Sequence, residues 1–289
     1  MLDGATKVAA IEGTEARGRL EIAFARAPSG RTYLRRQYAS YPYHVCRPLS
    51  FAGDPAGMAT IYVQSCAGGI FRDDLLREHI VAEDGAAAHV TTQASTIVHS
   101  MDRGSAGQGV LIEAAAGSFV EFLPDPFILF PQSRFASNLR VRAHDAATVV
   151  VADSFICHDP AGIGAMFDRF QGDLRVEDPQ GRLLTLDRFR TAGAVVADRR
   201  PGITGAFAAQ GGLFVIQRQV AASALVAALR DATADTAHVY AGASELPNRC
   251  GAWLRVMAAD GVALRAAMTA AWQAVRQTLT GQTPAPRRK

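Results

Sequence analysis

The sequence lacks the features of a secreted or membrane-anchored protein. Its start, Met1-Leu2-Asp3-Gly4, has neither the basic region nor the apolar region of a signal peptide. No stretch reaches the roughly 18 uninterrupted apolar residues that a membrane helix needs. Cysteine is scarce, no C-x-x-C pair occurs, and the four cysteines are scattered as Cys46, Cys66, Cys157 and Cys250. We therefore expect a cytoplasmic protein with reduced thiols, in preference to a disulfide framework or a zinc ribbon.

The sequence also has little excess charge and few of the common catalytic patterns. It carries 30 Lys and Arg against 27 Asp and Glu, a net charge of +3 that favours no nucleic-acid partner. The glycine pair Gly68-Gly69 and the acids after it match neither the phosphate-binding loop nor the dinucleotide-binding fingerprint. None of the seven histidines has a second histidine three or four residues away. The sequence therefore indicates no helix-borne pair of metal ligands.

The composition that remains is that of a folded globular protein. Hydrophobic residues make up 49% of the 289 residues and charged residues 20%, which excludes a disordered chain. We expect a single domain over residues 17–282, with residues 17–217 rich in strands and residues 212–281 mixing helices and strands. A flexible N-terminus over residues 1–16 and a basic tail over residues 283–289 flank it.

Short strand patterns dominate the first two thirds of the chain. Leu20, Ile22 and Phe24 alternate with less apolar residues, which is the period of a half-buried strand. Turn signals such as Glu83-Asp84-Gly85 and Ala116-Gly117 separate similar runs, at a spacing of roughly 30 residues. This pattern predicts a mainly β fold, either stacked sheets or a β-solenoid, and argues against alternating strand–helix–strand units.

The last third is predicted to contain helices, and the final one has the clearest pattern in the chain. Its apolar residues recur with helical spacing, and we expect them to pack against the core. Asp260 stands where the helix should be capped at its start, and Gly281 stands just beyond its end. The apolar stripe consists of Leu264, Met268, Ala271, Trp272, Val275 and Leu279.

Three polar segments between Ser65 and Pro126 follow strand-like runs. They are Gly68 to Leu75, His89 to Thr96 and Phe119 to Pro126. Polar side chains in such places cost free energy if they are buried without partners. One interpretation is turn chemistry, in which Asp74 caps a bend and the threonines lie on a sheet face. The other is a hydrophilic passage whose oxygen atoms hold a divalent transition metal loosely.

The order and spacing of these segments resemble the UreD (also called UreH) family of urease accessory proteins. That family shows a Gly-Gly loop closing on Gly-Asp, then Thr-Thr-Gln-Ala, then Glu-Tyr-Leu-Pro-Asp-Pro. The resemblance extends from about Arg17 to the C-terminus. The matching residues are Gly68, Gly69, Asp74, Thr91, Thr92, Gln93, Ala94, Thr96, Glu121, Leu123, Pro124, Asp125 and Pro126, with Asp187, Arg188, Trp272, Arg276, Pro286 and Arg287 further along.

The resemblance implies a non-catalytic scaffold and nickel chaperone in urease maturation. Such a protein binds the urease apoenzyme and a helical UreF-type accessory protein, through which a UreG-type GTPase delivers nickel. It binds Ni²⁺ only transiently and holds no tight cofactor, with no nucleic acid and no membrane as partner. A homodimer within the complex is left open. The expected residues of a polar route or partner contact are Gly68, Gly69, Asp74, Thr91, Thr92, Gln93, Ser95, Thr96, Glu121 and Asp125.

Two further sets of residues are candidates for metal binding and for catalysis. Asp74 is the expected transient nickel ligand, and Cys157-His158 is a second candidate, although neighbours in a strand point to opposite faces. Ser95 and His99 lie close in sequence, but no nucleophile elbow surrounds them. Glycoside hydrolysis uses a pair of carboxylates, and two such pairs are possible here, Asp73 with Asp74 and Glu121 with Asp125. A β-solenoid carbohydrate-active enzyme or binding module is therefore the alternative function.

The chain departs from the family pattern in two places. Asp73 stands where the family usually has glycine, and the segment from Asp159 to Gly164 replaces an expected Gly-Arg…Gly-Glu run. Near Pro131, the residues Phe127, Leu129 and Phe130 predict an exposed apolar patch that contacts a partner.

Overall fold

The structure is a computed structural model that describes residues 16–287. Its chain coils into a β-solenoid, which confirms the predicted mainly β class. The flexible N-terminus expected over residues 1–16 falls, except for Ala16, outside the described residues. Within the described residues, no helix is both long and apolar enough to cross a membrane.

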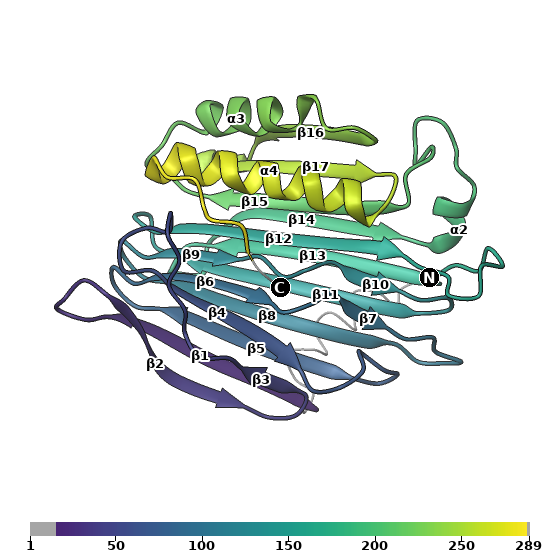
Figure 1. The fold of residues 1–289 in the computed structure, drawn as a ribbon, viewed down its shortest axis with the longest axis horizontal. Helices are drawn as coiled ribbons and strands as arrows, with labels where there is room; N and C mark the ends of the chain where they lie inside the picture. The colour runs from purple at the N-terminus through teal and green to yellow at the C-terminus, as the bar shows by residue number, and fades with distance from the viewer. Residues whose placement is uncertain (1–15, 288–289) are drawn as a thin grey trace.

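One face of the solenoid is sheet A, a twisted sheet of seven strands in the described part of the chain (Figure 1). Its five inner strands are parallel, because each comes from a successive turn of the coil. In spatial order the strands are β14 (Leu183–Thr191), β13 (Arg169–Glu177), β11 (Arg134–Ala143), β8 (Ala106–Ala114), β5 (Leu75–Ala82), β1 (Gly18–Arg26) and β2 (Thr32–Ala39).

The opposite face is sheet B, whose four solenoid strands are also parallel. Two short strands, β7 (Thr96–Val98) and β10 (Phe127–Leu129), pair with each other, and β10 also pairs with β12. The main path runs β16 (Val239–Glu245), β17 (Gly251–Ala258), β15 (Ala209–Ile216), β12 (Thr148–Cys157), β9 (Phe119–Phe122), β6 (Ala87–Thr92), β4 (Ala59–Ser65) and β3 (Tyr43–Val45).

The two edges of the solenoid are unlike each other. At one edge, tight turns such as those at Gly85 and Gly117 carry the chain from sheet A to sheet B. At the other edge, longer loops follow β4, β6, β9 and β12 and return the chain to sheet A. Long loops held by a regular scaffold are where function tends to reside. All three polar segments named above end at this second edge.

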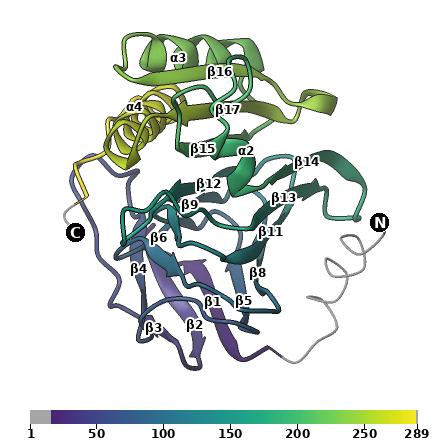
Figure 2. The ribbon, with the colours of Figure 1, turned by 90° about the vertical axis from the view of Figure 1, so that its right-hand side faces the viewer.

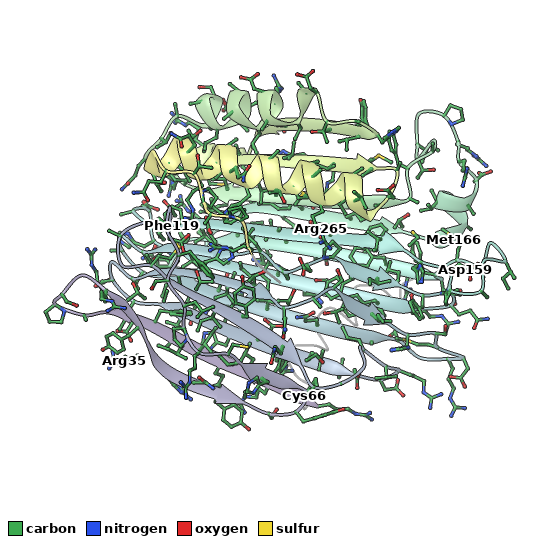
Figure 3. All side chains as sticks on the ribbon, in the orientation of Figure 1. Arg35, Cys66, Phe119, Asp159, Met166 and Arg265 are labelled. Carbon is green, nitrogen blue, oxygen red and sulfur yellow. The ribbon has the colours of Figure 1, made fainter. Side chains whose placement is uncertain are left out.

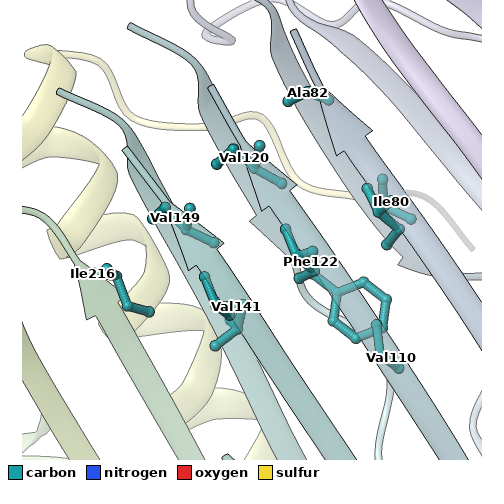
Figure 4. Packing of buried hydrophobic residues seen from close by; sticks show 14 of the residues in the cluster. Ile80, Ala82, Val110, Val120, Phe122, Val141, Val149 and Ile216 are labelled. Carbon is teal, nitrogen blue, oxygen red and sulfur yellow. The ribbon is translucent and has the colours of Figure 1, made fainter. Parts of the chain in front are cut away.

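The space between the sheets is filled by the inward side chains of both (Figure 4). Ile80 and Val110 of sheet A face Val120, Phe122 and Val149 of sheet B, and all are buried. Because strand residues alternate between faces, every second residue of each strand joins this core. The alternation read from the sequence therefore identifies the core of the solenoid.

The C-terminal third adds helices to the outer side of sheet B (Figure 2). The three described α-helices are α2 (Gly193–Ala197), α3 (Ala222–Ala234) and α4 (Gly261–Thr280), and a single 3₁₀ turn, η1, spans Pro247–Arg249. Asp260 accepts the N–H groups of Val262 and Ala263, both at 2.9 Å, and Gly281 ends α4 with φ = 69°. Both caps confirm the prediction. The short helix α2 was not predicted.

Candidate functional site

The candidate site lies at the edge where β4, β6 and β9 end. Parallel strands bring their carboxyl ends to one side of a sheet, so the loops that follow them meet there. Cys66, just after β4, and Phe119, at the start of β9, lie at opposite ends of sheet B (Figure 3). The three polar segments are therefore neighbours in space, about one solenoid turn apart in sequence.

The glycine pair packs its backbone against the loop of the next turn. The Ile70 N–H donates to the Ile97 carbonyl at 2.7 Å. Gly69 has φ = 141°, and a Cβ there would lie 2.4 Å from the Ile97 carbonyl oxygen, so no other residue fits. Gly68 has no such constraint, since a Cβ there would meet only the Phe71 ring at 4.0 Å. Of the two, Gly69 is the one that the fold requires.

Asp74 lies in the turn before β5, and its carboxylate holds that turn together. It accepts the Phe71 N–H at 2.8 Å, and its own N–H donates to the Phe71 carbonyl at 3.1 Å. The side chain is not among those that line the cavity described below. Asp73 has φ = 64°, the left-handed region that glycine favours and that Asp tolerates. This conformation accounts for the glycine expected at position 73.

Thr91 and Thr92 point to opposite faces of sheet B, as neighbours in a strand must. The buried Thr91 hydroxyl donates to the Leu123 carbonyl at 2.6 Å on the outer side. The Thr92 hydroxyl faces the interior and accepts the Asp125 N–H at 2.8 Å. These bonds join the second polar segment to the third.

A cavity of about 500 Å³ extends from this edge into the space between the sheets. Its outer part is lined by exposed residues, among them Ser65 at the end of β4 and Gln93 in the loop after β6, so the cavity opens at the loops. Its inner part is lined by side chains of both sheets, including Glu78 and Asp153. Of the residues expected from the sequence, the lining includes Gly68, Gly69, Thr92, Gln93, Ser95, Thr96 and Asp125.

The two inner carboxyl groups have pKa values shifted toward neutrality. Burial raises the pKa of Glu78 to about 7, although an N–H of the Gln108 amide donates to its carboxylate. Burial also raises the pKa of Asp153 to about 6, against the attraction of the nearby Arg255 guanidinium. Carboxyl groups with such pKa values exchange protons at physiological pH, which is a common property of functional sites.

Asp153 occupies a space that two glycines leave open. A Cβ at Gly172 would lie 3.3 Å from one Asp153 carboxylate oxygen, and a Cβ at Gly212 would lie 2.5 Å from the other. Its Oδ1 atom is buried and has no hydrogen-bond partner among the described residues. Arg255 pairs instead with Asp187 at 2.6 Å. Asp153 therefore has bonding capacity left for a ligand that enters the cavity.

Glu121, by contrast, lies on the outer side of sheet B, away from the cavity. Its carboxylate receives the Nδ1–H of His89 at 2.6 Å, the Nε1–H of Trp272 at 3.0 Å and the Nη2–H of Arg276 at 2.6 Å. Burial opposes its ionisation, but the hydrogen bonds from His89 and Arg276 outweigh it and lower the pKa of Glu121 to about 2. Burial lowers the pKa of His89, so its ring is neutral.

This buried cluster ties α4 and the C-terminal tail to the solenoid. Arg276 reaches Asp54 at 3.0 Å, and Arg287 reaches the same carboxylate at 3.1 Å while lying over the rings of Phe51 and Trp272. The geometry gives Glu121 a structural role. His89, in strand β6, is likewise a hydrogen-bonded residue of the sheet.

The remaining candidate metal ligands are not assembled into a site. Cys157 ends β12, and burial raises the pKa of its thiol to about 12, which disfavours the thiolate that binds metal. The ring of His158 packs against Phe130, with ring centres 5.5 Å apart. Among the described residues, no three His, Cys, Asp or Glu side chains come together as metal ligands.

The predicted apolar patch near Pro131 is wrong in part. Leu129 is only 1% exposed, and Phe127 packs against the buried cluster beneath it. Phe130 stays half-buried between the rings of His99 and His158. Side chains alternate between the two faces of β10, so Leu129 points inward, although the apolar sequence had predicted that it is exposed. Phe71, stacked on His99 at 4.4 Å and 45% exposed, is the more accessible aromatic residue.

Comparison with known sequences identifies the family of this chain. A sequence model of the UreD urease accessory protein family matches residues 16–289. The chain belongs to the UreD family. It is 43% identical to urease accessory protein UreD 1 of Pseudomonas syringae pv. syringae (strain B728a), over 93% of this chain and 94% of the relative. It is 39% identical to UreD 1 of Methylorubrum extorquens (strain PA1), over 94% of this chain and 92% of that relative. It is 32% identical to UreD of Haloarcula marismortui, over 93% of this chain and 89% of that relative.

UreD-family proteins are non-catalytic urease maturation factors, which confirms the function expected from the motifs. They work with urease and other accessory proteins, and the family is implicated in nickel delivery to urease. The carbohydrate-active alternative is thereby excluded. Sequence reasoning found the loop residues of the cavity but missed Glu78, Gln108 and Asp153, the polar side chains of its interior.

Proposed function

We propose that this UreD-family chain passes Ni²⁺ toward apo-urease through the cavity between its two sheets. The observation that carries the proposal is the pair of buried carboxyl groups, Glu78 and Asp153, on the lining of a cavity that opens at the polar loops. Nickel is the cargo, held transiently by oxygen atoms, and no tightly bound cofactor takes part.

The chemistry of the lining supports passage in preference to storage. Hydroxyl, amide and carboxylate oxygens bind nickel more weakly than clustered imidazole or thiolate groups. Thr92, Ser95, Thr96 and Gln93 supply the neutral groups near the mouth, and Asp125 supplies a carboxylate. The raised pKa values of the two inner carboxyl groups let an arriving cation displace a proton and a returning proton release the cation.

The loops at the mouth are the proposed contact for the protein that hands nickel over. Exposed Gln93, Phe71 and Gly68 surround the opening or stand beside it. We infer that a UreF-type protein, acting with a UreG-type GTPase, docks here in the cytoplasm, and that apo-urease receives the metal. Asp74, which shapes the turn beside the mouth, acts on this contact and not as a ligand inside the cavity.

The test removes the two carboxylate charges inside the cavity while the side chains keep their shape. Asp153→Asn and the double variant Glu78→Gln/Asp153→Asn should still bind the partner proteins but should lower GTP- and nickel-dependent urease activation several-fold. Asp231→Asn, on the exposed side of α3, is the matched control and should activate normally. Activation by the double variant at the wild-type rate would exclude this cavity as the nickel route. Lost partner binding would assign the carboxylates to assembly.

A further inference from the structure

Arg255 lies beside the carboxyl group of Asp153, and the proposed nickel route gives it no role. It belongs to β17 of sheet B, and its Nη2–H donates to the Asp187 carboxylate of β14, in sheet A, at 2.6 Å. The ion pair therefore joins the two sheets next to a residue that lines the cavity. It is mostly shielded from water, with 20% of the Arg255 side chain and 25% of the Asp187 side chain exposed.

The second terminal nitrogen of Arg255 lies close to the unpaired oxygen of Asp153. Both atoms, Nη1 of Arg255 and Oδ1 of Asp153, are buried and have no hydrogen-bond partner among the described residues. A Cβ at Gly212 would lie 3.5 Å from this nitrogen and 2.5 Å from this oxygen. The two atoms are thus separated by about 6 Å at most, a distance that one water molecule can bridge.

These two unpaired atoms have complementary chemistry. Buried polar atoms without a partner are uncommon, and each calls for an explanation. A guanidinium N–H only donates hydrogen bonds, and an ionised carboxylate only accepts them. The Arg255 guanidinium therefore has two carboxylates within its reach. In the structure it pairs with Asp187 and leaves Asp153 open.

The surroundings of the guanidinium allow it to move between the two carboxylates. Its central carbon lies 5.3 Å from the ring centres of Phe189 and Trp253 and 5.8 Å from that of Phe214. Aromatic faces attract a cation without fixing the direction of its N–H groups. Gly212 keeps the space between Arg255 and Asp153 clear, because a side chain there would contact both of them.

A guanidinium and a metal cation compete for the Asp153 carboxylate, because two like charges held by one carboxylate repel each other. While Arg255 pairs with Asp187, Asp153 is available to a cation in the cavity. When Arg255 moves to Asp153, its charge replaces that of the cation, and the partly exposed Asp187 is solvated by water. This exchange breaks one ion pair and forms another, and it requires no further reactant.

We propose that Arg255 alternates between Asp187 and Asp153 and in this way displaces Ni²⁺ from the cavity. The inference rests on the proposed function, since Asp153 must be a point at which nickel binds. It adds a release step to that function. It also gives a role to Asp187, one of the residues that match the family pattern, which holds the guanidinium away from Asp153 until release.

Equilibrium dialysis of the full-length protein against NiCl₂ tests the exchange. The quantity compared is the nickel that wild type binds and Asp153→Asn does not. Asp187→Asn weakens the contact that retains Arg255, because a neutral amide is a weaker acceptor than a carboxylate. The fraction of protein with an open Asp153 falls, so the dissociation constant of Ni²⁺ should rise by about fivefold or more. Arg255→Gln should lower this constant and should slow nickel release to an added chelator.

Two further variants separate movement of the guanidinium from a simple change of charge. In Asp187→Asn/Arg255→Gln, the Asp187→Asn substitution should lose most of its effect, because no guanidinium remains to be retained. Asp145→Asn removes the carboxylate that pairs with Arg218 in the turn between β11 and β12, and it should bind nickel like wild type. A crystal structure of nickel-free Asp187→Asn should show Arg255 paired with Asp153.

The proposal fails if Asp187→Asn weakens nickel binding equally with and without Arg255, since Asp187 would then act only through its charge. Wild-type nickel binding and release in both Asp187→Asn and Arg255→Gln, with binding lost in Asp153→Asn, would overturn the exchange but retain the nickel route. Unchanged nickel binding by Asp153→Asn would overturn both proposals. Circular dichroism like that of wild type would show that each variant is folded.

Discussion

Replacing Glu78 by glutamine should make the protein more stable and less functional. Glu78 is 7% exposed, and burial raises its pKa from the ordinary 4.5 to about 7. Its carboxylate accepts a hydrogen bond from the Gln108 amide, and the side-chain oxygen of a glutamine at position 78 can accept the same bond. The substitution therefore removes a titrating proton while it preserves the shape of the side chain and this hydrogen bond.

The size of the effect follows from proton linkage. A raised carboxyl pKa means that the folded protein binds more protons than the unfolded chain between pH 4.5 and about 7, so stability falls as pH rises through that window. At about 1.4 kcal/mol per pKa unit, the wild-type penalty is below about 1 kcal/mol at pH 5 and about 3 kcal/mol at pH 8. The advantage of Glu78→Gln should therefore grow by about 2 kcal/mol between these pH values.

Urea unfolding followed by tryptophan fluorescence at pH 5, 6.5 and 8 measures this difference. Glu245→Gln, an exposed carboxylate on β16, is the control and should run parallel to wild type across the range. If Glu78→Gln also runs parallel to wild type, Glu78 does not titrate in the folded protein near neutral pH. The argument for proton-coupled nickel release would then fail.

Other substitutions test the buried cluster and the loops. Glu121→Gln removes one of the two carboxylates that pair with the buried Arg276, leaving only Asp54, and should cost about 3 kcal/mol in urea unfolding; a loss below about 1 kcal/mol would contradict this role. Because the pKa of Glu121 is lowered to about 2, its stabilising contribution should be lost as pH falls below about 4.5. The free energy of unfolding of the variant should therefore decrease less than that of wild type as pH falls through this range. Arg287→Ala removes the ion pair with Asp54 and should lower the midpoint of thermal unfolding by the equivalent of about 1 kcal/mol, whereas no shift would mean that the tail is dispensable. Asp74→Ala should cost about 1 kcal/mol and weaken partner pull-down together with activation, and unchanged pull-down and activation would remove Asp74 from the proposed contact.

The sequence predicts much of this fold because its signals are local. Alternation in runs such as Leu20, Ile22 and Phe24 identifies inward-facing residues, and the turn signals mark the solenoid edge. Asp260 and Gly281 define α4 through bonds that span only a few residues. The loop residues of the cavity were also found, because polar residues after apolar strands are visible in the sequence.

The interior of the cavity could not be found in this way. Glu78 occupies an ordinary inward position of β5, and only its partners from other turns reveal that it borders open space. Asp153 depends on Gly212 and on Arg255, which lie far along the chain. Thr91 and Thr92 show the same limit on a smaller scale. One side of sheet B faces the cavity and the other faces α4. The sequence shows that the two threonines lie on opposite sides, but it does not show that Thr92 is the one that faces the cavity.

The buried cluster around Glu121 also has a consequence for synthesis of the protein. Arg276 follows Glu121 by 155 residues, and at about 5–20 residues per second the ribosome needs roughly 8–30 s to make that stretch. Throughout that interval the solenoid strands around Glu121 exist without the arginine that neutralises it or the helix that covers it. A nascent chain thus exposes an acidic, half-apolar surface that is absent from the finished molecule. Release from the ribosome, and not formation of the first solenoid turns, is the moment at which this surface closes.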